Sequence, residues 1–274
     1  MSRQTHLLCR RLGIDDPAFV EIESKWRVHA EDAEALRDWL SSRKETERVR
    51  KRVFFDQFLD TSDLRVLKAG CSLRLRYKGD GSQVYLQYKG PGFLREGLLF
   101  RSEFSSERLD HVVMEESHHD VVHFTDTSVR EILEEHAPPV MVRAMRGHLG
   151  TRTIARITSG PILCVYQKEK FNVVLNGTFL EPSLDRLYAF RINRRGLHAL
   201  SAFWEFENEI KAKDNDLGSK LKHLPELRAF DRGVSRKFDL RPERLDKYHR
   251  CASCFVALGR ARGRRRAPAG GVRS

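Results

Sequence analysis

The sequence contains no long apolar run. None of its hydrophobic stretches approaches the roughly 18 residues that a membrane-spanning helix needs, so we expect no segment to cross a bilayer. Residues 1–16 are basic but lack an apolar core, which argues against a secretory signal. Cysteine is scarce and odd in number, with 5 in 274 residues, which favours a reducing compartment over a disulfide framework. We therefore expect a cytoplasmic protein.

Motifs of several enzyme classes are also missing. The sequence has no Walker-type glycine loop and no Ser/His/Asp or Cys/His arrangement that indicates covalent catalysis. One CxxC pair, Cys251 and Cys254, lacks the second pair of ligands that a zinc site needs and the βαβ context of a redox motif. Zinc binding, redox chemistry and an incidental pair of cysteines all stay open for these two residues.

Acidic residues are outnumbered. Lys and Arg total 50 against 38 Asp and Glu, which gives a formal net charge of +12. Six arginines and no acid lie in the segment from Gly259 to Ser274, which lacks periodicity and is expected to be disordered. This tail is either a contact for a polyanion or simply solvated. We divide the chain into an N-terminal extension (1–17), a main domain (18–242) and a basic, disordered tail (243–274).

Strand-like alternation dominates the main domain. The expected strands cover Phe19 to Val28, Val49 to Leu59, Cys71 to Lys78, Gln83 to Lys89, Leu98 to Ser105, Thr151 to Ile157, Leu163 to Leu175, Leu187 to Ile192 and Ala202 to Ala212. Helices are fewer and are expected at Glu31 to Ser42, Asp63 to Lys68, Ser128 to His136 and Ser219 to Arg228. Asp80-Gly81 predicts a hairpin turn. This pattern favours an α+β protein built on an antiparallel sandwich or barrel.

The charged faces of the expected strands have an unusual distribution of sign. Residues two apart in a strand share a face, and acids gather on the first and last strands while bases gather on the third and fourth. Two interpretations follow. The charged residues form the solvated faces of a sandwich, or the sheet closes so that they line an interior that binds a divalent metal and a polyphosphate.

Several short elements, in order along the chain, resemble those of a known superfamily. They are Glu21-Ile22-Glu23-Ser24-Lys25 (ExExK), Phe55 to Leu64 (YFDTPDL), Leu67 to Arg76 (LxxxGxxLRxR), Tyr85 to Pro91 (TLKGP), Arg101-Ser102-Glu103 (RxE), Glu207-Asn208-Glu209 (a late ExE) and Ser235-Arg236-Lys237 (a C-terminal SK). Together they resemble the CYTH, or triphosphate tunnel metalloenzyme, superfamily, and the SK element also resembles the VTC polyphosphate polymerase domain. The chain departs from the family at Asn176, where relatives often have Asp.

The resemblance implies an eight-stranded antiparallel β-barrel with helices packed outside and a metal-dependent activity on triphosphates with Mg²⁺ or Mn²⁺. It assigns catalysis to Glu21, Glu23 and Lys25. The implied metal ligands are Glu21, Glu23, Glu207 and Glu209. The implied substrate-binding residues are Arg74, Arg76, Lys89, Arg101, Lys168, Lys170 and Lys237.

Three functions remain open. The first is a phosphohydrolase, or triphosphatase, that acts on inorganic triphosphate or on a nucleoside or organic triphosphate. The second keeps the fold but changes the reaction to that of a polyphosphate polymerase or an adenylyl cyclase. The third is a non-catalytic module that binds polyphosphate or RNA. The expected partner is therefore a triphosphate or polyphosphate, with a further polyanion contact through the arginine-rich tail.

Overall fold

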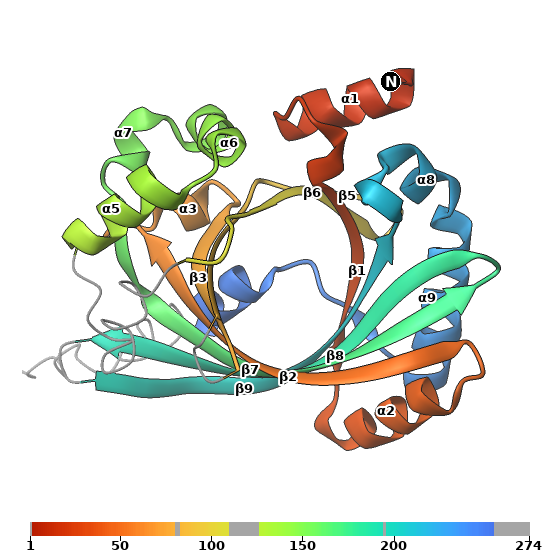
Figure 1. Cartoon of the computed structure of the whole chain (residues 1–274). Helices are drawn as coiled ribbons and strands as arrows, with labels where there is room; N and C mark the ends of the chain where they lie inside the picture. The colour runs from red at the N-terminus through yellow and green to blue at the C-terminus, as the bar shows by residue number, and fades with distance from the viewer. Residues whose placement is uncertain (1, 80–82, 110–125, 194–195, 255–274) are drawn as a thin grey trace, which may run out of the picture.

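A closed antiparallel β-barrel forms the centre of the molecule (Figure 1). The computed structural model describes residues 2–79, 83–109, 126–193 and 196–254. Eight strands surround the barrel axis in the order β1-β9-β8-β7-β2-β3-β4-β6, and pairing of β1 with β6 closes the ring. The predicted α+β fold with an eight-stranded barrel is confirmed.

The strands are long, and two short ones flank the barrel. They are β1 (Val20–Val28), β2 (Thr46–Asp60), β3 (Ser72–Lys78), β4 (Gln83–Lys89), β5 (Phe93–Arg95), β6 (Leu98–Ser105), β7 (Thr158–Leu175), β8 (Thr178–Asn193), β9 (Gly196–Lys211) and β10 (Arg241–Pro242). Strand β5 extends β6, and β10 extends β1.

Helices α1 to α3 and α5 to α9 pack around the outside of the ring (Figure 1). They are α1 (Arg3–Leu12), α2 (Ala33–Ser42), α3 (Arg65–Lys68), α5 (Asp126–His136), α6 (Pro139–Leu149), α7 (Thr151–Ile154), α8 (Leu217–Lys222) and α9 (Leu224–Phe238), with short 3-10 turns η1 (Pro17–Phe19), η2 (Ala30–Asp32) and η3 (Lys213–Asn215). None of the helices in the described residues is long and apolar enough to span a membrane.

The main hydrophobic core lies between the outer face of the barrel and these helices. Alternate residues such as Ile22, Leu75 and Phe206 are fully buried on that face, while their charged neighbours along each strand point inward. Helix α9 buries Phe230, whose ring lies 6.1 Å from that of Trp39 on α2. The alternation therefore describes a barrel with an apolar outside and a charged interior, and the sandwich interpretation is wrong.

Local turn chemistry explains two differences from the sequence prediction. Thr151–Ile154 is helical rather than extended: the amides of Thr153 and Ile154 donate to the carbonyl of Gly150, and the amide of Ala155 donates to that of Thr151. Asn176 and Gly177 both have positive φ, at 49° and 77°, and form the two-residue turn between β7 and β8. Asn176 is thus a turn residue rather than a substituted metal ligand. The predicted turn at Asp80-Gly81 lies outside the described residues.

The segment after β10 differs most from expectation. Residues 243–254, which the sequence analysis placed in a disordered tail, are described, and residues 247–254 are helical. Tyr248 is fully buried, stacks on Phe58 with ring centroids 4.4 Å apart and donates a hydrogen bond to Asp60 (2.7 Å). This segment lies across the ring of strands in Figure 1, where it is drawn in dark blue. The tail assignment is therefore wrong for residues 243–254.

Candidate active site

The interior of the barrel is a cavity of about 540 Å³ lined by side chains from all eight of its strands. Twelve basic and seven acidic side chains of the described residues line it. Every site residue inferred from the sequence lies on this wall except one; those on the wall are Glu21, Glu23, Lys25, Arg74, Arg76, Lys89, Arg101, Lys168, Lys170, Glu207 and Glu209. The strand alternation placed these residues on the charged faces, and the resemblance implied that those faces line one interior.

One part of the wall brings several carboxylates together. The backbone register places Glu23 directly opposite Glu209, and Glu21 lies beside them on β1. Burial, followed by the nearby Glu103 and Glu23, raises the pKa of Glu21 to about 8 even though Lys89 opposes this. Glu23 Oε1 is buried and has no hydrogen-bond partner among the described residues, although Lys25 Nζ lies 3.3 Å away. Lys89, Lys25 and Lys211 contact these carboxylates in the absence of a metal. Carboxylate oxygens are the donors that Mg²⁺ and Mn²⁺ prefer, so this set fits a hard divalent cation.

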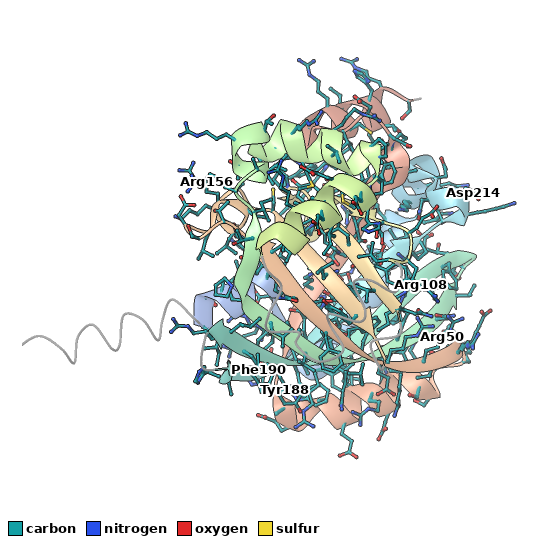
Figure 2. All side chains as sticks on the ribbon, turned by 60° about the vertical axis from the view of Figure 1, so that its left-hand side comes forward. Arg50, Arg108, Arg156, Tyr188, Phe190 and Asp214 are labelled. Atoms are coloured by element: carbon teal, nitrogen blue, oxygen red, sulfur yellow. The ribbon has the colours of Figure 1, made fainter. Side chains whose placement is uncertain are left out.

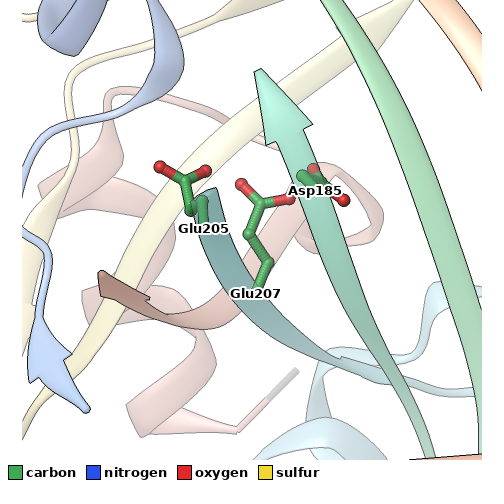
Figure 3. Close-up of side chains that lie close together, drawn as sticks. All are labelled: Asp185, Glu205 and Glu207. Atoms are coloured by element: carbon green, nitrogen blue, oxygen red, sulfur yellow. The ribbon is translucent and has the colours of Figure 1, made fainter. Parts of the chain in front are cut away.

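A second buried acidic cluster lies next to it. Asp185, Glu205 and Glu207 offer oxygens within 4.8 Å of one another and point together from β8 and β9 (Figure 3). Lys247 Nζ lies 3.0 Å from Asp185 Oδ2 and 2.9 Å from Glu205 Oε1, and it also contacts Glu207. This cluster could bind a metal, but an ammonium group of the protein already occupies it.

Glu207 is the residue of the predicted metal shell that belongs to this second cluster. Lys25 Nζ and Lys168 Nζ each lie 2.9 Å from its carboxylate oxygens. Burial alone would raise the pKa of Glu207, but Lys168, Lys247 and Lys25 together lower that pKa well below its ordinary value. Glu207 is therefore charged and paired with lysines. Glu103, which lies near Glu21 and belongs with the carboxylates around Glu21 and Glu23, was not predicted as a site residue.

A buried aspartate holds the two arginines of β3. Asp56 on β2 accepts hydrogen bonds from Arg74 Nη1 (2.9 Å) and from Arg76 Nε and Nη2 (both 2.8 Å). Burial would raise the pKa of Asp56, but Arg74 and Arg76 lower it, so the carboxylate stays charged. The sequence analysis did not single out Asp56. It fixes both guanidinium groups on the tunnel wall, which reduces the conformational entropy lost when they bind an anion.

The remaining predicted cations are also paired with acids. Lys89 Nζ lies 3.2 Å from Glu103 Oε1, and Arg101 Nη1 donates to Asp246 Oδ2 at 3.0 Å. Since each cation already has a carboxylate partner, an incoming anion shares or displaces that partner rather than meeting a bare charge.

Lys237 is the exception among the predicted substrate-binding residues. It lies on the exposed side of α9, outside the barrel, with its Nζ 5.7 Å from the ring of Trp39. The prediction for Lys237 is wrong, because the SK element forms the end of a helix that packs against the outer face of the sheet.

The lysine that sequence reasoning missed comes from the C-terminal segment. Asp246, Lys247 and Tyr248 all line the cavity. They were assigned to the basic tail because they lie only 12 to 14 residues before the arginine-rich stretch that begins at Arg260. The same helix holds Cys251, which is buried, and Cys254, which is partly exposed. Neither cysteine belongs to a group of three or more metal-ligating side chains within the described part of the chain.

A comparison with known protein families agrees with the motifs and with the tunnel. Residues 20–145 match the CYTH domain. This part of the chain is a CYTH domain. Strands β7, β8 and β9 lie beyond the matched residues and complete the barrel. No curated protein sequence matches the chain closely enough to count as a relative.

Two solved structures were compared with the chain, and one of them shares its fold. HpAC1 from Hippeastrum, assigned as an adenylyl cyclase and described as having a dominant triphosphatase activity, is 19% identical with a TM-score of 0.54, over 85% of this chain and 95% of that one. The PH1819 protein from Pyrococcus horikoshii is 18% identical with a TM-score of 0.48, over 88% of this chain and 99% of that one. At such identity the comparison with HpAC1 establishes the fold alone.

Proposed function

We propose that the protein is a metal-dependent phosphohydrolase that cleaves inorganic triphosphate or a nucleoside triphosphate inside the barrel. The observation that supports this most is the division of one cavity into a side that gathers carboxylates, around Glu21 and Glu23, and a basic side held in place by Asp56. The dominant triphosphatase activity described for HpAC1 is consistent with it.

The basic wall would bind the phosphate chain. Arg74 and Arg76 offer planar guanidinium groups for paired hydrogen bonds to phosphate oxygens, and Lys89 and Arg101 add further donors. At an effective dielectric constant of about 20, two unit charges about 4 Å apart interact by about 4 kcal/mol before desolvation is subtracted. Three phosphates reach more of these cations than two, so we expect triphosphate to be preferred over pyrophosphate.

The acidic side would hold the cation and the water. Glu21, Glu23 and Glu209, with Glu103 beside them, are the residues that would hold Mg²⁺ or Mn²⁺. A bound divalent cation there would neutralise charge that develops on the phosphate oxygens. A carboxylate of this set would orient the attacking water by accepting its hydrogen bond. Lys25, buried between Glu23 and Glu207, would keep these two carboxylates apart and in place.

The test is a substrate panel with product identification. Purified protein is incubated with tripolyphosphate, ATP, thiamine triphosphate or pyrophosphate, with Mg²⁺, Mn²⁺ or EDTA, and the products are separated by ion chromatography. The proposal predicts metal-dependent phosphate release from tripolyphosphate or a nucleoside triphosphate, and little from pyrophosphate. Accumulation of cyclic AMP or of polyphosphate from ATP would instead identify a cyclase or a polymerase, and phosphate chain binding without turnover would identify a binding module.

A further inference from the structure

Strand β2 presents two further arginines to the tunnel, Arg50 and Arg52, which no motif identified. Both line the cavity, and Arg50 is labelled in Figure 2. A strand rises about 3.3–3.4 Å per residue, so the Cα atoms of Arg52 and Arg50 lie about 13 and 20 Å along β2 from Asp56. They are therefore positioned beyond Arg74 and Arg76, toward one mouth of the tunnel.

The register brings like charges together at this mouth. Arg52 is directly opposite Lys168 on β7, and Arg50 is directly opposite Lys170. Both lysines contact carboxylates of neighbouring strands. Lys168 Nζ lies 2.9 Å from Glu207 on β9, and Lys170 Nζ lies 2.8 Å from Glu181 on β8. The acids of β8 and β9 thus pair with the two lysines, and they do not pair with the arginines of β2.

No carboxylate within salt-bridge distance of Arg50 or Arg52 is found in the described part of the chain. Arg50 Nε is buried without a hydrogen-bond acceptor in that part. Like charges directly opposite each other weaken a sheet, and a buried donor without an acceptor does so as well. An anion bound between the strands would relieve both. Arg52 is exposed and Arg50 half-buried, so an anion can reach them from solution.

We propose that Arg50 and Arg52 form a second anion-binding position, which takes the next phosphate groups of an inorganic polyphosphate whose end occupies the triphosphate-binding wall. The location of that end rests on the proposed function. Alternate strand residues lie roughly 6.5–7 Å apart on one face, so the two guanidinium groups follow one another along the channel. The neighbours opposite them in the register are cations, which select for negative charge and offer nothing that identifies a base or a sugar.

The test measures binding without turnover. Affinities for tripolyphosphate and for a longer inorganic polyphosphate are determined by calorimetry in EDTA at several salt concentrations, for the wild-type protein, Arg52→Gln and Lys51→Gln. Lys51→Gln is the matched control, since Lys51 is exposed on the same strand and pairs with Glu169 at 3.5 Å outside the tunnel. A 5′-triphosphorylated oligonucleotide is the third ligand.

The wild-type protein and Lys51→Gln should bind the longer chain at least about tenfold more tightly than they bind tripolyphosphate, as expected for added charge-assisted hydrogen bonds. Arg52→Gln should lose that preference and keep its affinity for tripolyphosphate, and its salt dependence with the longer chain should fall by about one unit of slope. Equal affinity of the wild-type protein for both chains would overturn the proposal, as would an equal loss for both in Arg52→Gln. It would also be overturned if only the oligonucleotide depended on Arg52. Turnover does not enter these measurements, so failure of the proposed hydrolysis is recognised separately in the substrate panel.

Discussion

The ammonium nitrogen of Lys89 lies 2.6 Å from Glu21 Oε2, although the two residues are 68 positions apart in the sequence. The contact joins the acidic side of the tunnel to the basic side, since Glu21 lies on β1 and Lys89 on β4. In the absence of substrate and metal, each therefore partly neutralises the other. Under the proposed function, binding of a phosphate chain to Lys89 and of a cation to Glu21 would replace one buried contact by two new ones, which would couple the two binding events.

The position of two lysines relative to the barrel predicts opposite effects of the same substitution. Lys89→Gln should weaken tripolyphosphate binding by about tenfold, because Lys89 lies on the tunnel wall. Lys237→Gln should leave it unchanged, because Lys237 is outside. Calorimetry on both variants measures this. A weaker affinity in Lys237→Gln would restore the assignment of Lys237 made from the sequence.

Lys247 is predicted to be essential for stability. Lys247→Met leaves Asp185, Glu205 and Glu207 without their shared cation in a buried site, so the free energy of unfolding should fall by about 3–5 kcal/mol. Lys237→Met is the control and should lose less than about 1 kcal/mol, since only an exposed contact with Trp39 is removed. Urea unfolding followed by circular dichroism gives both values. An unchanged midpoint for Lys247→Met would mean that the C-terminal segment does not occupy the tunnel.

Asp231 on α9 predicts a dependence of stability on pH. Burial raises the pKa of Asp231 from 3.8 to about 7, although hydrogen bonds with Asn208 and Ser24 partly oppose this. The folded protein thus binds this proton more tightly than the unfolded chain, so the contribution of Asp231 is fully favourable below about pH 4 and is lost as the pH rises to about 7. Asp231→Asn should remove that loss and raise the free energy of unfolding at pH 8 by a few kcal/mol at most, on the order of 1.4 per unit of pKa shift.

The measurement is urea unfolding of wild-type protein and Asp231→Asn at pH 5 and pH 8. The difference between the two proteins should be larger at pH 8. Asp239→Asn serves as the control, because Asp239 is exposed at the end of the same helix and has a left-handed backbone that asparagine tolerates. Parallel pH dependences for wild type and Asp231→Asn would show that Asp231 keeps an ordinary pKa in the folded state.

Local pattern predicted the strands and their charged faces, and the family resemblance supplied the barrel. Period-two alternation grouped the side chains that share a face with Glu21, Arg74 or Lys89, but it did not distinguish a solvated face from the inward face of a closed sheet. The partners of those residues were not predictable in the same way. Asp56 supports the arginines from another strand, and Lys247 reaches the acidic cluster from a segment 40 residues after Glu207, so both depend on register and packing across the barrel.

The wrong assignments share a related cause. Lys237 carries a short motif whose meaning depends on which face of a helix it occupies, and α9 turns it away from the barrel. The arginine-rich composition near the C-terminus hid the helix that precedes it, which buries Tyr248 and Cys251. Composition describes a whole segment, whereas burial differs from one residue to the next.

The most direct test of the proposed chemistry is phosphate release from tripolyphosphate by wild-type protein, Glu23→Gln and Glu47→Gln, each with Mg²⁺ or Mn²⁺ and with EDTA. Glu47 is exposed on β2, so its substitution controls for the change in charge. We predict metal-dependent release by wild type and Glu47→Gln, abolition by EDTA and a loss of about a hundredfold or more in Glu23→Gln with an unchanged circular dichroism spectrum. Near wild-type turnover by Glu23→Gln would contradict the assignment of the acidic side of the tunnel as the catalytic metal site.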